Sequence, residues 1–130
     1  MLKKLLIPAL TLACFSFSNQ ANAQVEQALA NICAIVKADD KSELRKKMRK
    51  VQSDYSIKLR DYYGGISCAG NSLIRVALLN DATETGTLLV KKMPKKLLTA
   101  PESDGKTILV WINEQGFEGN PITQVVKDRM

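Results

Sequence analysis

A pair of cysteines limits the fold of this chain more than any other feature. The chain has 130 residues and three cysteines: Cys14 lies in an apolar N-terminal segment, and Cys33 and Cys68 lie 35 positions apart. A chain this short has a limited core, so a covalent link would supply a large share of its stability. The compartment decides whether that link forms, because disulfides persist in oxidising surroundings.

The N-terminal segment predicts export. Lys3 and Lys4 precede an apolar run over residues 5–17, and Ala21-Asn22-Ala23 is a small-residue cleavage site. These three zones in this order are typical of a secretory signal peptide, and the run is too short for a permanent membrane anchor. We therefore expect residues 1–23 to be a cleaved signal peptide and the mature chain to be periplasmic.

Lipidation at Cys14 is the alternative for this segment. Thr11-Leu12-Ala13 precedes the cysteine, and it faintly resembles a lipoprotein box. Such a box normally has leucine where Thr11 stands, so a lipoprotein is less favoured than a cleaved chain. Both products lie outside the cytoplasm.

Export makes a disulfide between Cys33 and Cys68 the expected state of the two remaining cysteines. Closing a loop of 35 residues stabilises a fold by about 4 kcal/mol in the chain-entropy model. A redox pair would need closer spacing, and a metal site would need more ligands than two cysteines in a chain without histidine.

Apolar residues at helical spacing predict a mainly α-helical domain, with about four helices and a short C-terminal one. The four helices are expected over Val25–Lys37, Lys41–Ser53, Leu73–Leu79 and Thr83–Met93. Asp40, three residues before Glu43, has the spacing of a helix cap. Gly86 costs its helix about 1 kcal/mol relative to alanine, which close packing against a neighbour would explain.

Two segments outside these helices differ in pattern. Residues 55–63 alternate with period two, which favours either a short extended segment or a continued helix. Residues 107–112 are β-branched and apolar and predict a strand, one of one or two short strands expected near the C-terminus. Pro121 predicts the start of the short C-terminal helix. The chain therefore divides into a signal peptide (1–23), a disulfide-stapled helical domain (24–94) and a C-terminal extension (95–130). The extension is either a flexible appendage or, as Trp111 within an apolar run favours, docked on the rest of the chain.

Positive charge is concentrated in two clusters. Without residues 1–23 the chain has 17 Lys and Arg against 13 Asp and Glu, a net charge of +4. The clusters lie on the second helix and around Pro94, and a solvated helix face is the simpler explanation of each. If they share one side, they form an anion-binding patch. The residues of this possible patch are Arg45, Lys46, Arg49, Lys50, Lys91, Lys92, Lys95 and Lys96.

Catalytic patterns are missing from the sequence, so we expect no enzyme, no cofactor and no metal site. The absence of histidine excludes the usual nucleophile–base pairs. Asp39 and Asp40 are better explained by helix capping, and Glu114 and Glu118 by a solvated turn.

Three functions remain. We expect a non-enzymatic domain that binds another periplasmic protein, through an apolar or aromatic patch around Tyr62, Tyr63 and Trp111. The alternative is an electrostatic binder of phospholipid or lipopolysaccharide head groups that uses the basic patch. A periplasmic address argues against nucleic acid. Inhibition of a cell-wall hydrolase ranks last, because a basic target of the lysozyme type would require an acidic inhibitor and this chain is basic.

Several motifs between Ile32 and Pro94 resemble the DUF3718 family of small secreted proteobacterial proteins. These motifs are Ile32-Cys33, Leu44-Arg45-Lys46-Lys47-Met48, Cys68-Ala69-Gly70-Asn71-Ser72-Leu73 and Ala77. The family usually has Cys-Asn-Gly where this chain has Cys68-Ala69-Gly70. The resemblance implies a paired cysteine and brings no known activity.

Residues 70–77 are also similar to the opening of an ankyrin repeat. Ser72, Ile74 and Ala77 match the expected residue types, whereas Leu73 and Arg75 replace proline and histidine. Repeat folds need about three units to stack. One degraded unit therefore implies a helix pair and no binding groove.

Overall fold

The computed structural model describes residues 23–130. The chain divides into two compact units, of which one ends at Ala30 and the other spans Asn31–Met130. Residues 23–28 of the first unit form a helix. The predicted signal sequence up to Asn22, with the alternative lipidation site at Cys14, lies outside the described residues.

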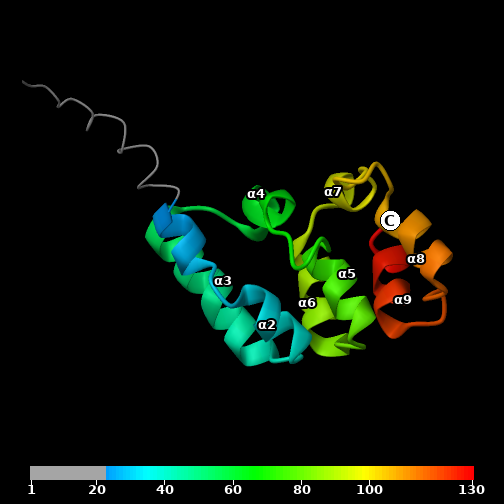
Figure 1. The fold of residues 1–130 in the computed structure, drawn as a ribbon, viewed down its shortest axis with the longest axis horizontal. Coiled ribbons are helices and arrows are strands. Elements are labelled where there is room, and N and C mark those ends of the chain that lie inside the picture. The colour runs from blue at the N-terminus through cyan, green and yellow to red at the C-terminus, as the bar shows by residue number, and fades with distance from the viewer. Residues whose placement is uncertain (1–22) are drawn as a thin grey trace, which may run out of the picture. The chain divides into compact units, whose positions relative to one another are not determined.

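The second unit is α-helical, as the hydrophobic spacing predicts. Within residues 31–130 it has eight α-helices and one 3-10 helix, which are shorter and more numerous than expected (Figure 1). The prediction of one helix over Val25–Lys37 is wrong, because the backbone of Asn31 is left-handed (φ 68°) and interrupts it. Helix α2 (Ile32–Lys37) begins after this break.

Helix α3 (Lys41–Tyr55) pairs with α2 and begins at the predicted cap. The Oδ1 of Asp40 accepts a hydrogen bond of 3.1 Å from the backbone N of Glu43, which confirms the cap. Leu44 and Val51 form the buried stripe of α3.

The segment after α3 differs from both alternatives that the sequence left open. Ser56 has a left-handed backbone (φ 59°), which ends α3. A short helix α4 (Leu59–Tyr62) and the 3-10 helix η2 (Tyr63–Gly65) follow. Asp61 starts α4 by accepting a hydrogen bond of 2.7 Å from the backbone N of Lys58.

Helices α5 (Leu73–Leu79) and α6 (Thr83–Lys92) form the centre of the second unit and lie against each other. All six residues from 73 to 78 are buried. Thr85 joins α6 to the turn between α2 and α3: its Oγ1 donates to the carbonyl of Val36 over 3.0 Å, and its backbone N donates to Asp39 over 2.8 Å.

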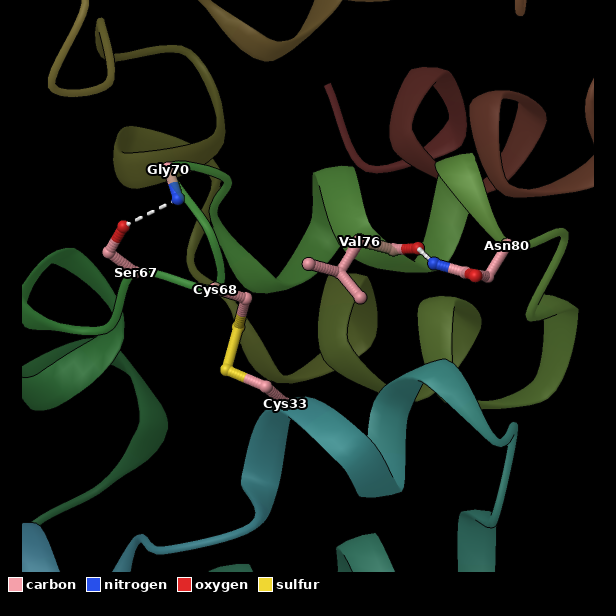
Figure 2. Close-up of a disulfide and its surroundings, with 6 residues drawn as sticks. All are labelled: Cys33, Ser67, Cys68, Gly70, Val76 and Asn80. Atoms are coloured by element: carbon pink, nitrogen blue, oxygen red, sulfur yellow. Dashed lines mark hydrogen bonds between the residues drawn. A yellow bond between two sulfur atoms is a disulfide. The ribbon is translucent and has the colours of Figure 1, made fainter.

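The predicted disulfide between Cys33 and Cys68 is present, with the two Cα atoms 5.7 Å apart. Figure 2 shows it joining α2 to the turn that precedes α5. Within that turn, Ser67 Oγ accepts a hydrogen bond of 3.2 Å from the backbone N of Gly70. The bond therefore fastens the α2–α3 pair to the central helices near one end of α2, while Thr85 holds the other end.

The predicted strand at 107–112 is wrong, since these residues begin helix α8 (Ile108–Gln115). Thr107 Oγ1 accepts a hydrogen bond of 3.2 Å from Val110 N, and left-handed Gly116 (φ 78°) ends the helix. Ile108, Trp111 and Ile112 are buried, which is a helical spacing. No strand is assigned anywhere in residues 23–130, so β-branched side chains here lack a partner strand and pack as a helix instead.

Helices α7 (Lys95–Leu98) and α9 (Pro121–Asp128) complete the C-terminal segment. Pro121 is at the first turn of α9, as predicted. Helix α9 packs on α6, and a Cβ added to Gly86 would lie 2.9 Å from Ile122 Cγ1 and 3.0 Å from Ala77 Cβ. The close packing expected at Gly86 is therefore confirmed, and residues 95–130 belong to the same compact unit as the preceding helices.

Candidate functional site

A groove with a volume of about 840 Å³ lies where α3, α4 and the end of α6 meet the last residues of the chain. Its floor is partly apolar, with Leu59 and Met93 buried and Met48 and Pro94 half-buried. Seven of its twelve lining residues are Lys or Arg, and none is acidic. These seven are Arg45, Arg49, Lys58, Arg60, Lys91, Lys92 and Arg129. We call this site the basic groove.

None of the seven cations of the basic groove forms an ion pair among the described residues. Every carboxylate that forms an ion pair in the described residues pairs with a cation outside this set. All seven side chains are exposed at the rim. Uniform charge above an apolar floor concentrates the local field, which attracts anions.

The basic residues of helix α3 lie on more than one of its faces. Arg45 and Arg49 lie one turn apart on the groove face. Lys46 and Lys50 do not line the groove. Lys46 forms an ion pair of 3.5 Å with Glu43, and Lys50 forms one of 2.9 Å with Asp54. The hydrogen bond to Asp54 raises the pKa of Lys50 above its usual value.

The second predicted cluster divides in the same way. Lys91 and Lys92 at the end of α6 line the groove, next to Met93 and Pro94. Lys95 and Lys96 are exposed on α7 and do not line it. Four of the eight residues predicted as a binding patch are therefore together, two from each cluster.

Three cations of the groove were missed by sequence reasoning. Lys58 and Arg60 flank the start of α4, and Arg129 lies at the C-terminus. Each lies outside a run of basic residues, so the sequence has no local signal for it. The Nη2 of Arg129 donates a hydrogen bond of 2.6 Å to the carbonyl of Met93, which holds this side chain at the groove.

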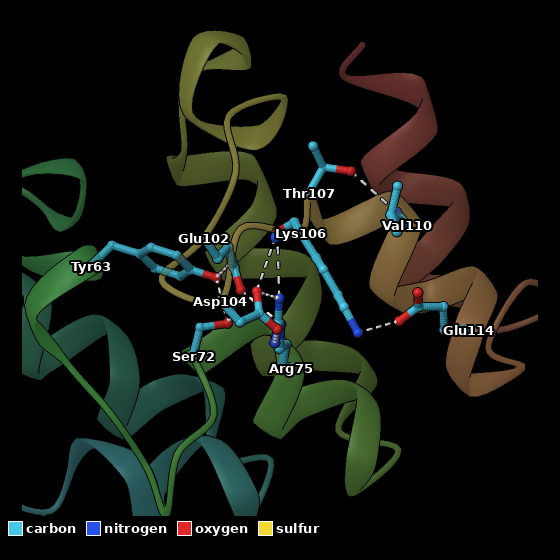
Figure 3. A network of polar contacts seen from close by, with 9 residues as sticks. All are labelled: Tyr63, Ser72, Arg75, Glu102, Asp104, Lys106, Thr107, Val110 and Glu114. Carbon is cyan, nitrogen blue, oxygen red and sulfur yellow. Dashed lines mark hydrogen bonds and ion pairs between the residues drawn. The ribbon is translucent and has the colours of Figure 1, made fainter.

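A second cavity with a volume of about 650 Å³ shares Arg60 and Met93 with the basic groove. Tyr63, Ser72 and Glu102 lie in its wall and bond to one another (Figure 3). The Tyr63 hydroxyl donates to Glu102 Oε2 over 2.7 Å, and Ser72 Oγ donates to Glu102 Oε1 over 2.8 Å. Burial, together with the charge of Glu102, raises the pKa of Tyr63 far above its usual value.

Arg75 connects this network to the loop before α8. Its side chain is 6% exposed; Nε lies 2.8 Å from Glu102, and the two Nη atoms donate to Asp104 over 2.8 and 2.9 Å (Figure 3). The guanidinium also lies over Trp111, 5.0 Å from the ring centroid. These bonds hold the pKa of Asp104 well below its usual range. The network fastens the C-terminal segment to α5.

The expectation of an exposed aromatic patch is wrong. Tyr62, Tyr63 and Trp111 are 7%, 7% and 6% exposed. Burial raises the pKa of Tyr62 to about 12. The three rings fill the core, because helices this short need large side chains to bury enough apolar area.

The chemistry that this site supports is charge recognition. Arginine and lysine donate several hydrogen bonds at once to phosphate or carboxylate oxygens. In residues 23–130 no group of three or more histidine, cysteine or acidic side chains could hold a metal ion. Nor does any helix there have the length and apolarity to cross a membrane.

One family match was found. The family model described as "Protein of unknown function (DUF3718)" matches residues 32–100. The match spans α2 to α7 and includes both bonded cysteines and all groove cations but Arg129. No curated protein and no solved structure matches the chain.

Proposed function

The chain belongs to the DUF3718 family of proteins of unknown function, and we propose that it is a periplasmic, non-enzymatic protein that binds phosphate-bearing head groups in its basic groove. The observation that carries this proposal is the set of seven exposed cations around one groove without an acidic residue. Phosphate groups on phospholipids or lipopolysaccharide are the anions that an exported protein meets at the envelope.

The distribution of ion pairs on α3 favours a bound ligand over a surface that is only solvated. Lys46 and Lys50 have local acids as partners, whereas Arg45 and Arg49 on the same helix have none among the described residues. Charges brought together without counter-charges repel one another, which costs folding free energy. A bound anion would remove that cost.

Binding of another protein through an apolar patch has less support. The aromatic residues expected to form that patch are in the core. The large apolar side chains that remain exposed, Leu79, Leu97 and Val110, belong to three different helices.

Export is part of the same proposal. The basic, apolar and small-residue zones of residues 1–23 support it, as does the bond between Cys33 and Cys68, because such bonds persist outside the reducing cytoplasm. Cell fractionation of the tagged full-length chain tests it, with recovery in the cytoplasm as the contrary result.

Vesicle sedimentation tests the head-group proposal with a matched pair of double variants. Arg45→Gln with Arg49→Gln removes two charges from the groove, and Lys46→Gln with Lys50→Gln removes two charges from the same helix outside it. Each basic residue near an anionic surface contributes about 1 kcal/mol, so the groove variant should bind phosphatidylglycerol vesicles about 30-fold more weakly. The other variant should bind nearly as the wild type does.

Salt and neutral lipid complete the test. Wild-type binding should weaken strongly between about 20 and 300 mM salt, because exposed charges are screened. Phosphatidylcholine vesicles should not bind. Equal losses in the two double variants, or binding that resists salt, would contradict the proposal.

A further inference from the structure

The second cavity adjoins the basic groove and has a different chemistry. The two share Arg60 and Met93 in their walls, so they are direct neighbours. The second cavity includes the carboxylates of Asp61 and Glu102, while the groove has none. Arg60 and Arg75 line the cavity too and balance these two carboxylates, so it has no excess of positive charge to attract a second phosphate. The part of a ligand that enters it should therefore be neutral.

Polar side chains of the second cavity are available for hydrogen bonds. The amide of Asn71 and the hydroxyl of Ser103 line it and have no hydrogen-bond partner among residues 23–130. Ser103 is exposed and Asn71 half-buried, so a ligand can reach both. Amides and hydroxyls bond well to hydroxyl groups, because each can donate and accept.

Apolar side chains also line this cavity. Leu97 and Pro101 are exposed in it, and Ile66 is half-buried. Neutral hydrogen-bonding groups and apolar side chains in one cavity suit a sugar ring, which presents hydroxyls at its edge and C–H groups on its face. An acyl chain would leave the hydrogen-bonding groups without partners, at a cost in free energy.

We propose that the ligand is a sugar phosphate, with the phosphate in the basic groove and the sugar in the second cavity. This inference rests on the proposed function and narrows it to phosphorylated glycan head groups. Asn71 and Ser103 then recognise the sugar, and Arg60 lies at the junction of the two cavities.

Calorimetric titration of the mature, disulfide-bonded protein tests this inference with three soluble probes: glucose 1-phosphate, glycerol 3-phosphate and inorganic phosphate. Glucose 1-phosphate should bind about tenfold more tightly than the other two, since it gains two hydrogen bonds. Asn71→Ala combined with Ser103→Ala should abolish this preference and leave the affinity for inorganic phosphate unchanged. Asn113→Ala, an exposed amide on α8, is the control and should change nothing.

The outcomes separate this inference from the proposed function. Equal affinities of the wild type for all three probes would overturn the sugar assignment and leave the phosphate groove standing. A preference that survives in the double variant with an unchanged melting curve would also overturn it. Failure of all three probes to bind would reject the sugar phosphate, and the vesicle experiment would then decide whether the groove binds phosphate head groups at all.

Discussion

The guanidinium of Arg129 donates a hydrogen bond of 2.6 Å to the backbone carbonyl of Met93, across 36 positions of sequence. Met93 forms part of the floor of the basic groove, and Arg129 forms part of its rim. The C-terminal residues therefore contribute to a site that lies otherwise within residues 45–94. This contribution needs α9 to pack on α6, because Arg129 directly follows α9.

Removing this cation should weaken anion binding. We expect Arg129→Ala to bind anionic vesicles about fivefold more weakly, because one basic residue near an anionic surface contributes about 1 kcal/mol. Lys127→Ala removes a charge from the last turn of α9, two residues before Arg129 and outside the groove, and is the matched control. Sedimentation at low salt measures both, and equal losses would show that net charge alone matters.

A methyl group at position 86 should destabilise the fold. Gly→Ala inside a helix normally gains about 1 kcal/mol, but here the new Cβ would crowd Ile122 and Ala77. Overpacking typically costs about 1–3 kcal/mol, so we expect Gly86→Ala to lose about 1 kcal/mol in urea unfolding.

A second substitution checks the cause of this loss. Ile122→Val shortens the side chain that a residue at position 86 would touch, so the double variant should be more stable than the sum of the two single changes predicts. Gly119→Ala, which meets no atom within 4 Å, should be nearly neutral. Strict additivity would contradict the packing explanation.

The disulfide should account for a large part of the stability. Cys33→Ser opens a link across 35 residues, which is worth about 4 kcal/mol in the chain-entropy model. For a domain of this size, that loss corresponds to a fall in Tm of roughly 15–30 °C. Calorimetry of the variant and of the reduced wild type should give the same low Tm. An unchanged melting curve, or free thiols in protein taken from the periplasm, would refute the prediction.

Acid should weaken the contact between Arg75 and Asp104. The pKa of Asp104 is lower in the folded chain than in the unfolded chain, because its carboxylate accepts hydrogen bonds from Arg75. The stabilisation is therefore complete above the unfolded-state pKa of about 3.9 and is lost as the pH falls below it.

The variant Asp104→Asn should consequently unfold at lower urea than the wild type at pH 7, and the difference should shrink below about pH 4. Glu118→Gln, an exposed acid outside the network, is the control and should follow the wild type. A difference between Asp104→Asn and the wild type that persists unchanged into strong acid would contradict the role assigned to the carboxylate.

Local signals account for the parts of the fold that sequence reasoning predicted. The cap at Asp40 and the start of α9 at Pro121 depend on residues within one helical turn. The errors over residues 25–37 and 107–112 arise where another local signal competes. Asn31 adopts a left-handed backbone inside an apolar pattern, and Thr107 and Gly116 cap a β-branched run as a helix.

Sequence reasoning predicted four of the seven cations in the candidate site. Arg45, Arg49, Lys91 and Lys92 came from runs of basic residues, but the sequence does not say which members of a run share a face with another run. Lys58, Arg60 and Arg129 are isolated in sequence and join the groove through long-range packing. The opposite error concerns residues that were expected at the site and lie in the core, namely Tyr62, Tyr63 and Trp111. An aromatic side chain is equally suited to a binding patch and to a core, and the sequence does not show which neighbours it has.

The sequence by itself determined the helical class, the positions of several caps and the cysteine pair, because these depend on periodicity and on residue chemistry close along the chain. The tertiary structure decided which cations gather in one groove, how the C-terminal segment completes it, and which aromatic residues are buried. These properties depend on how α3, α4, α6 and α9 pack, and packing is a sum of contacts between residues far apart in sequence.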